Sequence, residues 1–142
     1  VMEYCSHVWC GASVNQLKIL DKLQKRAYRI IDDHTITENL QSLQLRRDVC
    51  ALTLFYKYVH GECSSELYSE LPEFRKAQRT TRESVRNHHL VVALETCRTD
   101  IFKQSFIPRT SRLWNKLPQE CFPIVFNKQV FKTNINKILN SQ

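Results

Sequence analysis

The apolar residues between positions 45 and 60 repeat with the period of an α-helix. They are spaced by three or four residues, which places their side chains on one helical face: Leu45, Val49, Leu52, Tyr56 and Val59. Further apolar side chains inside the segment widen this face beyond a single stripe. Gly61 follows directly, and glycine often ends helices because it adopts positive φ at no steric cost. We therefore expect a central helix over about Leu45–His60, against which the rest of the chain packs.

Other segments of the chain also favour helices. Only 2 glycines occur in 142 residues, which argues against a glycine-turned β-sandwich. Short helices are expected over residues 36–43, where Thr35 and Glu38 are spaced as a capping box, and over residues 65–71. A last helix is expected over about residues 127–139. The length fits one domain, residues 1–142, and no apolar run is long enough to span a membrane.

The segment Val14–Ile31 predicts a helix with two distinct stripes. Ser13 and Gln16 form a capping box at its start. An apolar stripe is expected to face the core: Leu20, Leu23, Ala27 and Ile30. A basic stripe is expected to face outward, either as a solvated face or as a contact for phosphate: Lys18, Lys22, Lys25 and Arg29.

Residues 88–107 predict a short β-hairpin. Residues 88–94, HHLVVAL, are β-branched and apolar, and residues 99–107 include an alternating, aromatic-rich run typical of a half-buried strand. A turn over residues 95–98 would join the two strands. The expected fold class is therefore mainly α: a small helical domain with a short β-hairpin (α+β).

The segment after this hairpin is expected to anchor the core. Pro108 ends the second strand, and the hydroxyl of Thr110 or Ser111 can then cap a turn of helix. Trp114 has leucines at helical spacing on either side, which predicts a core residue in preference to a platform for stacking bases.

Positive charge is concentrated in one part of the chain. The net charge is +7, and residues 75–116 alone hold 10 basic and 3 acidic side chains. Residues 74–87 have no useful apolar period and predict a basic linker. Arginine pairs well with phosphate, so this region predicts contact with an anionic partner such as nucleic acid. The candidate contact residues are Arg75, Lys76, Arg79, Arg82, Arg86, Arg109, Arg112 and Lys116.

The sequence offers little support for catalysis or for a bound cofactor. Cys5, Cys10 and His7 stand close together, but His88, His89 and Cys97 do not supply a second pair at zinc spacing. Two glycines cannot build a phosphate-cradling loop, and no hydrolase motif occurs. Asp32 and Asp33 follow a helical pattern, so they are interpreted as helix-end residues and not as a metal-binding catalytic pair. We expect no catalytic residues, no metal and no cofactor.

Several blocks of the sequence resemble the C-terminal end of reverse transcriptases from non-LTR (LINE-type, jockey-like) retrotransposons. The blocks cover nearly the whole chain, in the family's order: EYCSHVW at 3–9, LDKLQKRAYRIID at 20–32, LQSLQLRRDV at 40–49, LFYKYVHGECSSEL at 54–67, RTTR at 79–82, and SFIPRTSRLWNKLP at 105–118 with the CFP and FKTNINKIL that follow. One departure is Cys10, where the family usually has a small residue, often glycine.

The resemblance implies a role as well as a parent protein. These blocks lie in the thumb of such enzymes and in the region after it, downstream of the catalytic palm. The chain would then be a non-catalytic piece of an RNA-directed DNA polymerase. It would grip the backbone of an RNA/DNA template–primer and pack against the upstream palm domain.

The alternative is a domesticated or decayed remnant that serves as a structural or protein-interaction domain without nucleic-acid binding.

The sequence shows no secretory signal, so free cysteines are the default. We expect an intracellular location, both cytoplasmic and nuclear. Val1 is not a natural start residue and the resemblance begins almost at once, so we expect the chain to be part of something longer.

Overall fold

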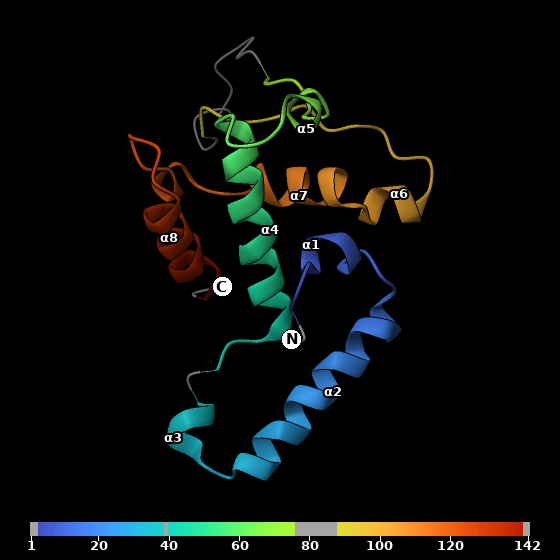
Figure 1. The fold of residues 1–142 in the computed structure, drawn as a ribbon, viewed down its shortest axis with the longest axis vertical. Coiled ribbons are helices and arrows are strands. Elements are labelled where there is room, and N and C mark those ends of the chain that lie inside the picture. Colours follow the sequence, from blue (N-terminus) through green and yellow to red (C-terminus); the bar gives the residue numbers. More distant parts are fainter. Residues whose placement is uncertain (1–2, 39, 76–87, 141–142) are drawn as a thin grey trace.

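The computed structural model describes residues 3–38, 40–75 and 88–140 and is built around helix α4 (Leu43–Val59). Helices α7 (Phe106–Trp114) and α8 (Lys128–Asn140) pack on α4 from different sides (Figure 1). The expected central helix is confirmed, with its start two residues earlier than predicted. The expected last helix is also confirmed, since α8 begins at Lys128 behind the Asn127 side chain, which accepts from the Gln129 and Val130 N–H groups.

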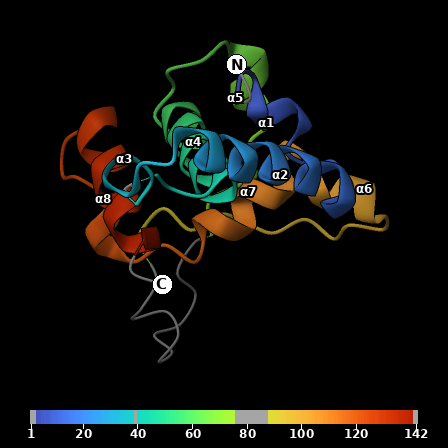
Figure 2. The same ribbon diagram turned by 90° about the horizontal axis from the view of Figure 1, so that it is seen from below.

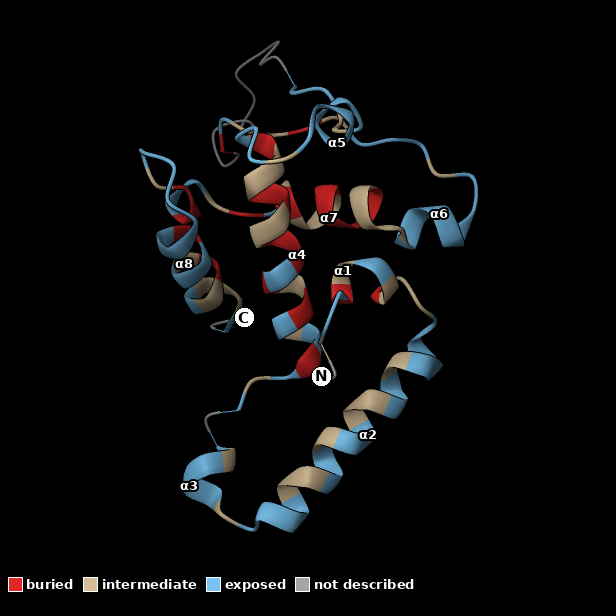
Figure 3. Ribbon diagram, in the orientation of Figure 1, coloured by how far each residue is buried: buried red, intermediate tan, exposed pale blue. Residues whose placement is uncertain are grey.

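The core lies between α4, α7 and α8. Phe55 and Tyr56 of α4, Trp114 of α7 and Phe131 of α8 are all within 1% of complete burial. Tyr56 stacks on Phe131 with ring centroids 4.1 Å apart, and Phe55 lies 5.1 Å from Trp114. Buried residues gather on these three helices in Figure 3. Trp114 is therefore a core residue, as the sequence predicted.

Both ends of α4 are closed by short-range hydrogen bonds. At its start, the Ser42 hydroxyl accepts from the Leu45 N–H. At its end, Gly61 adopts a φ of 75°, and its N–H and that of Glu62 reach back to the Tyr58 and Lys57 carbonyls. This is a Schellman motif, in which the positive φ favours glycine. The predicted role of Gly61 is confirmed.

Helix α2 (Val14–Ile31) forms with the predicted bounds but does not enter the core. Together with α3 (His34–Thr37) it runs below α4, and Figure 2 shows α2 crossing beneath the body. Neither helix has a buried residue. Within the described residues, polar contacts connect α2 to the segment around the start of α4: Asp21 lies 3.8 Å from Arg47, and Gln24 donates to the Gln41 carbonyl at 3.0 Å.

The expected β-hairpin is wrong. No strand forms in the described residues, and the only pairing there is an isolated antiparallel bridge between Phe74 and Val92. The backbone of residues 90–93 finds other partners. The Asn115 amide side chain bonds both the N–H and the C=O of Val92, and the Trp114 indole N–H donates to the Leu90 carbonyl at 2.7 Å. Because these backbone N–H and C=O groups already have hydrogen-bond partners, the segment does not need to pair with a second strand.

The predicted second strand is helical instead. Thr99 caps α6 (Asp100–Gln104) by accepting from the Phe102 N–H, and α7 follows after Ser105. Pro108 does not end a strand but lies in the first turn of α7, where a backbone N–H would have no intrahelical partner. Thr110 and Ser111 are buried within α7 and do not cap it.

The remaining elements are short. They comprise α1 (Ser6–Trp9), α5 (Ser65–Ser69) and a 3-10 turn η1 (Gln119–Cys121).

The helix expected over residues 36–43 is displaced toward the N-terminus. Helix α3 starts at His34, because the Asp33 carboxylate accepts from the Thr35 N–H and caps the helix. The capping box expected between Thr35 and Glu38 does not define this start.

Candidate nucleic-acid interface

The basic side chains of α2 share one exposed face. Helical geometry places them in a sector of about 100° that runs about 16 Å along the axis. The face, called the α2 basic face below, consists of Lys18, Lys22, Lys25, Arg26 and Arg29. Each of these residues is exposed, and none forms an ion pair within the part of the chain that the structure describes. The positive potential of this face is therefore open to a partner.

Local sequence explains why α2 presents this face intact. The capping box fixes its start: the Ser13 hydroxyl accepts from the Gln16 N–H, and the Gln16 side chain accepts from the Ser13 N–H. Asp32 ends the helix in the left-handed region, with a φ of 46°. Between these ends, each basic residue has another three or four positions away, so all five stay on one side of the helix from residue 18 to residue 29.

The apolar side of α2 is only partly covered. Of the residues expected to face the core, Leu20 and Ala27 are half-buried, whereas Leu23 and Ile30 are 48% and 74% exposed. The expected core stripe is therefore wrong for its outer half. Ile19, Leu23 and Ile30 form an exposed apolar strip beside the α2 basic face, because the helix turns only its inner residues toward α4.

Four of the eight predicted contact residues, Lys76, Arg79, Arg82 and Arg86, lie outside the described residues. The basic linker predicted over 74–87 lies there too, apart from its first two residues. Of the others, Arg75 is exposed, and its backbone N–H donates to the Val91 carbonyl at 2.8 Å. Lys116 is also exposed, near the end of α7.

Arg109 and Arg112 are occupied by contacts within the protein. Arg109 is buried; it lies 3.0 Å from Asp48 and also donates to the Cys10 sulfur. Arg112 is half-buried and donates to the Lys103 carbonyl. The predicted set therefore does not form one surface. We leave Arg109 out of the proposed contacts, because its charge is offset by a carboxylate.

The side chains considered for zinc do not come together. Cys5 is exposed, whereas Cys10 is buried against Arg109, and the His7 ring packs on Phe106. Burial raises the pKa of the Cys10 thiol more than Arg109 lowers it, which disfavours the thiolate that zinc needs. Within the described residues, no group of three or more His, Cys, Asp or Glu side chains could hold a metal ion.

The adjacent aspartates at the end of α2 have structural roles. Asp32 closes α2, and Asp33 caps α3, where hydrogen bonds from Thr35 lower the pKa of the Asp33 carboxyl. Both lie at helix ends, as the sequence suggested.

Comparisons with known proteins give no further guide to the site. No family model, curated protein or solved structure matches the chain. None of the helices in the described residues has the length and apolar character needed to cross a bilayer.

Proposed function

We propose that this chain binds nucleic-acid backbone without catalysing a reaction, as the thumb and post-palm segment of a non-LTR retrotransposon reverse transcriptase. The single observation that carries the binding role is the α2 basic face, with its exposed basic residues free of ion pairs in the described chain. Arg75 and Lys116 are further exposed basic residues that lie outside this face. The parent enzyme is proposed from the sequence resemblance alone.

The chemistry of the α2 basic face favours a phosphate backbone. Lysine and arginine contacts displace the counterions condensed on nucleic acid, which supplies affinity that does not depend on base sequence. The face is long enough to meet several successive phosphates, since duplex DNA carries one charge per about 1.7 Å of its axis. The exposed apolar strip of Ile19, Leu23 and Ile30 would then pack against the upstream palm domain.

The experiment measures binding of the chain to a template–primer duplex as a function of salt. If about five phosphates are contacted, log Kobs should fall against log salt with a slope of ~−4 to −5. Replacing Lys18, Lys22 and Lys25 by glutamine should flatten the slope by ~2–3, since each lost contact removes about one.

The matched control removes the same charge from another helix. Lys128, Lys132 and Lys137 are exposed on α8, and their replacement by glutamine should change the slope by less than ~1. A third variant, Arg79, Arg82 and Arg86 to alanine, tests the segment predicted from sequence. Equal slopes for the wild-type chain and the α2 variant would contradict the proposal.

A second candidate is a protein-interaction domain that does not bind nucleic acid. The exposed apolar strip on α2 favours it, because soluble monomers rarely leave neighbouring large aliphatic side chains uncovered. This candidate predicts no salt-dependent binding to any template–primer duplex, so the same titration separates the two.

A further inference from the structure

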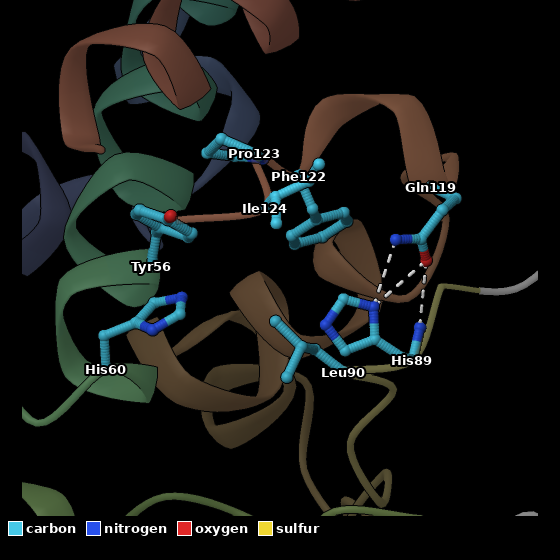
Figure 4. A pocket seen from close by; sticks show the side chains of 8 residues that line it. All are labelled: Tyr56, His60, His89, Leu90, Gln119, Phe122, Pro123 and Ile124. Carbon is cyan, nitrogen blue, oxygen red and sulfur yellow. Dashed lines mark hydrogen bonds between the residues drawn. The ribbon is translucent and has the colours of Figure 1, made fainter. Parts of the chain in front are cut away.

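A cavity of about 330 Å³ lies at the C-terminal end of α4, at the opposite end of that helix from the α2–α4 contacts (Figure 4). Most of its lining consists of ring side chains: Tyr56 of α4, His60 directly after α4, His89, and Phe122 after η1. Leu90, Gln119 and two residues of the loop that follows Phe122 complete the lining. Its volume is at the lower end of the range of small-molecule sites.

Several of these rings are held in place by neighbouring groups. Gln119 accepts from the His89 backbone N–H at 3.1 Å, and its amide also contacts His89 Nδ1. Figure 4 shows the other His89 ring nitrogen on the side of the cavity. Phe122 stacks on the buried His88 ring with centroids 4.2 Å apart, and the Tyr56 hydroxyl accepts from the Asn127 N–H. A flat ligand would meet a preformed site.

The cavity also presents unused hydrogen-bonding groups. The His60 ring nitrogens have no hydrogen-bond partner among the described residues, although the ring packs on Tyr56 and Phe126. His60 is exposed, but the partial burial of its ring and the nearby His89 lower its pKa, so the imidazole is neutral at neutral pH and offers one donor and one acceptor.

The ring side chains and the imidazole nitrogens of the cavity favour one chemical class of ligand. A purely aliphatic ligand would leave the imidazole nitrogens without partners. A small anion gains little from a neutral His60, and two histidines without a third ligand do not make a zinc site. A planar aromatic heterocycle satisfies both the ring lining and the hydrogen-bonding groups.

We propose that the cavity between His60, His89 and Phe122 binds one unpaired nucleobase. Arg75, whose backbone N–H donates to the carbonyl of Val91 next to the cavity residue Leu90, is the basic residue that this proposal assigns to the attached phosphate. The base can come from a free nucleotide or from a nucleic-acid strand, and the strand case rests on the proposed function.

The first test titrates the full chain with adenosine, AMP and ribose 5-phosphate while the imidazole signals of His60 and His89 are followed by NMR. Adenosine and AMP should shift both signals, and ribose 5-phosphate should shift neither. His60→Ala and Gln119→Ala should each weaken adenosine binding at least about fivefold, the lower bound for loss of one base contact. The matched control is His34→Ala, on the exposed helix α3, which should bind adenosine as the wild-type chain does.

The second test identifies the source of the base. A hairpin oligonucleotide with one unpaired adenine is compared with the same hairpin carrying an abasic site there. If a strand supplies the base, removal of the base should weaken binding at least as much as His60→Ala does, because the abasic site loses every contact in the cavity. Equal binding of the two hairpins, with adenosine still bound, assigns the cavity to a free nucleotide.

The cavity proposal is overturned if adenosine shifts neither imidazole, or if its affinity survives both His60→Ala and Gln119→Ala. The two proposals fail separately. Replacing the α2 lysines should leave adenosine binding unchanged, and a chain without salt-dependent duplex binding could still bind adenosine in this cavity.

Discussion

Trp114 contacts more rings than any other side chain in the described residues. It is completely buried, its indole N–H bonds the Leu90 carbonyl, and its rings contact Phe55, Phe122 and Phe131. Trp114→Ala should therefore destabilise the chain by ~3–5 kcal/mol, the range for removal of a large buried aromatic side chain. Urea denaturation measures this. Lys116→Ala, two residues away and exposed, should cost less than ~0.5 kcal/mol, and similar losses for both would mean that Trp114 is not a core residue.

His88 makes stability depend on pH. Its Nδ1 accepts from the Leu90 N–H, so its Nε2 donates to the Trp114 carbonyl at 2.9 Å, and the ring is neutral. Burial lowers the pKa of His88 below its ordinary value of 6.5. The unfolded chain therefore binds a proton that the folded chain excludes. The stability that the neutral His88 ring contributes is fully present above pH 6.5. It is lost as the pH falls from there through the lower pKa of His88 in the folded chain.

We expect the free energy of unfolding to fall between pH 7.5 and 5, with His88 contributing at most ~1.4 kcal/mol per pH unit. His60, whose pKa is also lowered by burial, adds to the same trend. His88→Phe should flatten the curve even though it weakens the fold, whereas His34→Asn should leave its shape unchanged. A wild-type stability that is constant across this range would contradict the prediction.

At the scale of elements, α2 differs from the other long helices in what holds it. It has no buried residue, and its contacts to α4 include the Asp21–Arg47 pair and the Gln24–Gln41 hydrogen bond. Local opening costs little free energy where few apolar contacts are lost. Amide hydrogen exchange should therefore be faster by at least about tenfold in the middle of α2 than in the middle of α4. Asp21→Asn should speed exchange in α2 alone, and equal protection of the two helices would contradict this account.

The elements also show what the sequence could predict. The bounds of α2 were predicted because its capping box and its period agree, and α4 and α8 because their apolar periods are strong. The hairpin could not be excluded, because the groups that satisfy residues 90–92 belong to Trp114 and Asn115, more than twenty residues later. Local alternation in residues 101–107 gave no indication that Thr99 would start a helix.

The same limit applies to the candidate site. The outward-facing basic stripe of α2 could be predicted from residue spacing alone. The exposure of Leu23 and Ile30 could not, because it depends on which other elements pack against α2. Arg109 was indistinguishable in sequence from a surface arginine, since its partner Asp48 lies 61 positions earlier. The rings around the cavity come from α4, the segment after residue 87 and the turn after η1, so only the fold brings them together.

At the scale of the whole molecule, the packed part and the candidate binding face are separate. The body is formed by α4, α7 and α8, while the α2 basic face lies on a helix that contributes nothing buried to it. Charge can therefore be removed from α2 without disturbing the core. This separation is why the lysine variants proposed above report on binding and not on folding.

The order of the chain has a consequence for its synthesis. Helix α4 is complete once residue 59 has been made, yet the partners that cover one of its sides, Phe131 and Ile135 of α8, are added more than seventy residues later. Until they leave the ribosome, Phe55 and Tyr56 have an incomplete covering, and exposed aromatic surface of this kind favours aggregation or chaperone binding. A nascent chain stalled before Phe131 should therefore be held by chaperones, and one stalled well beyond Ile135 should be released from them.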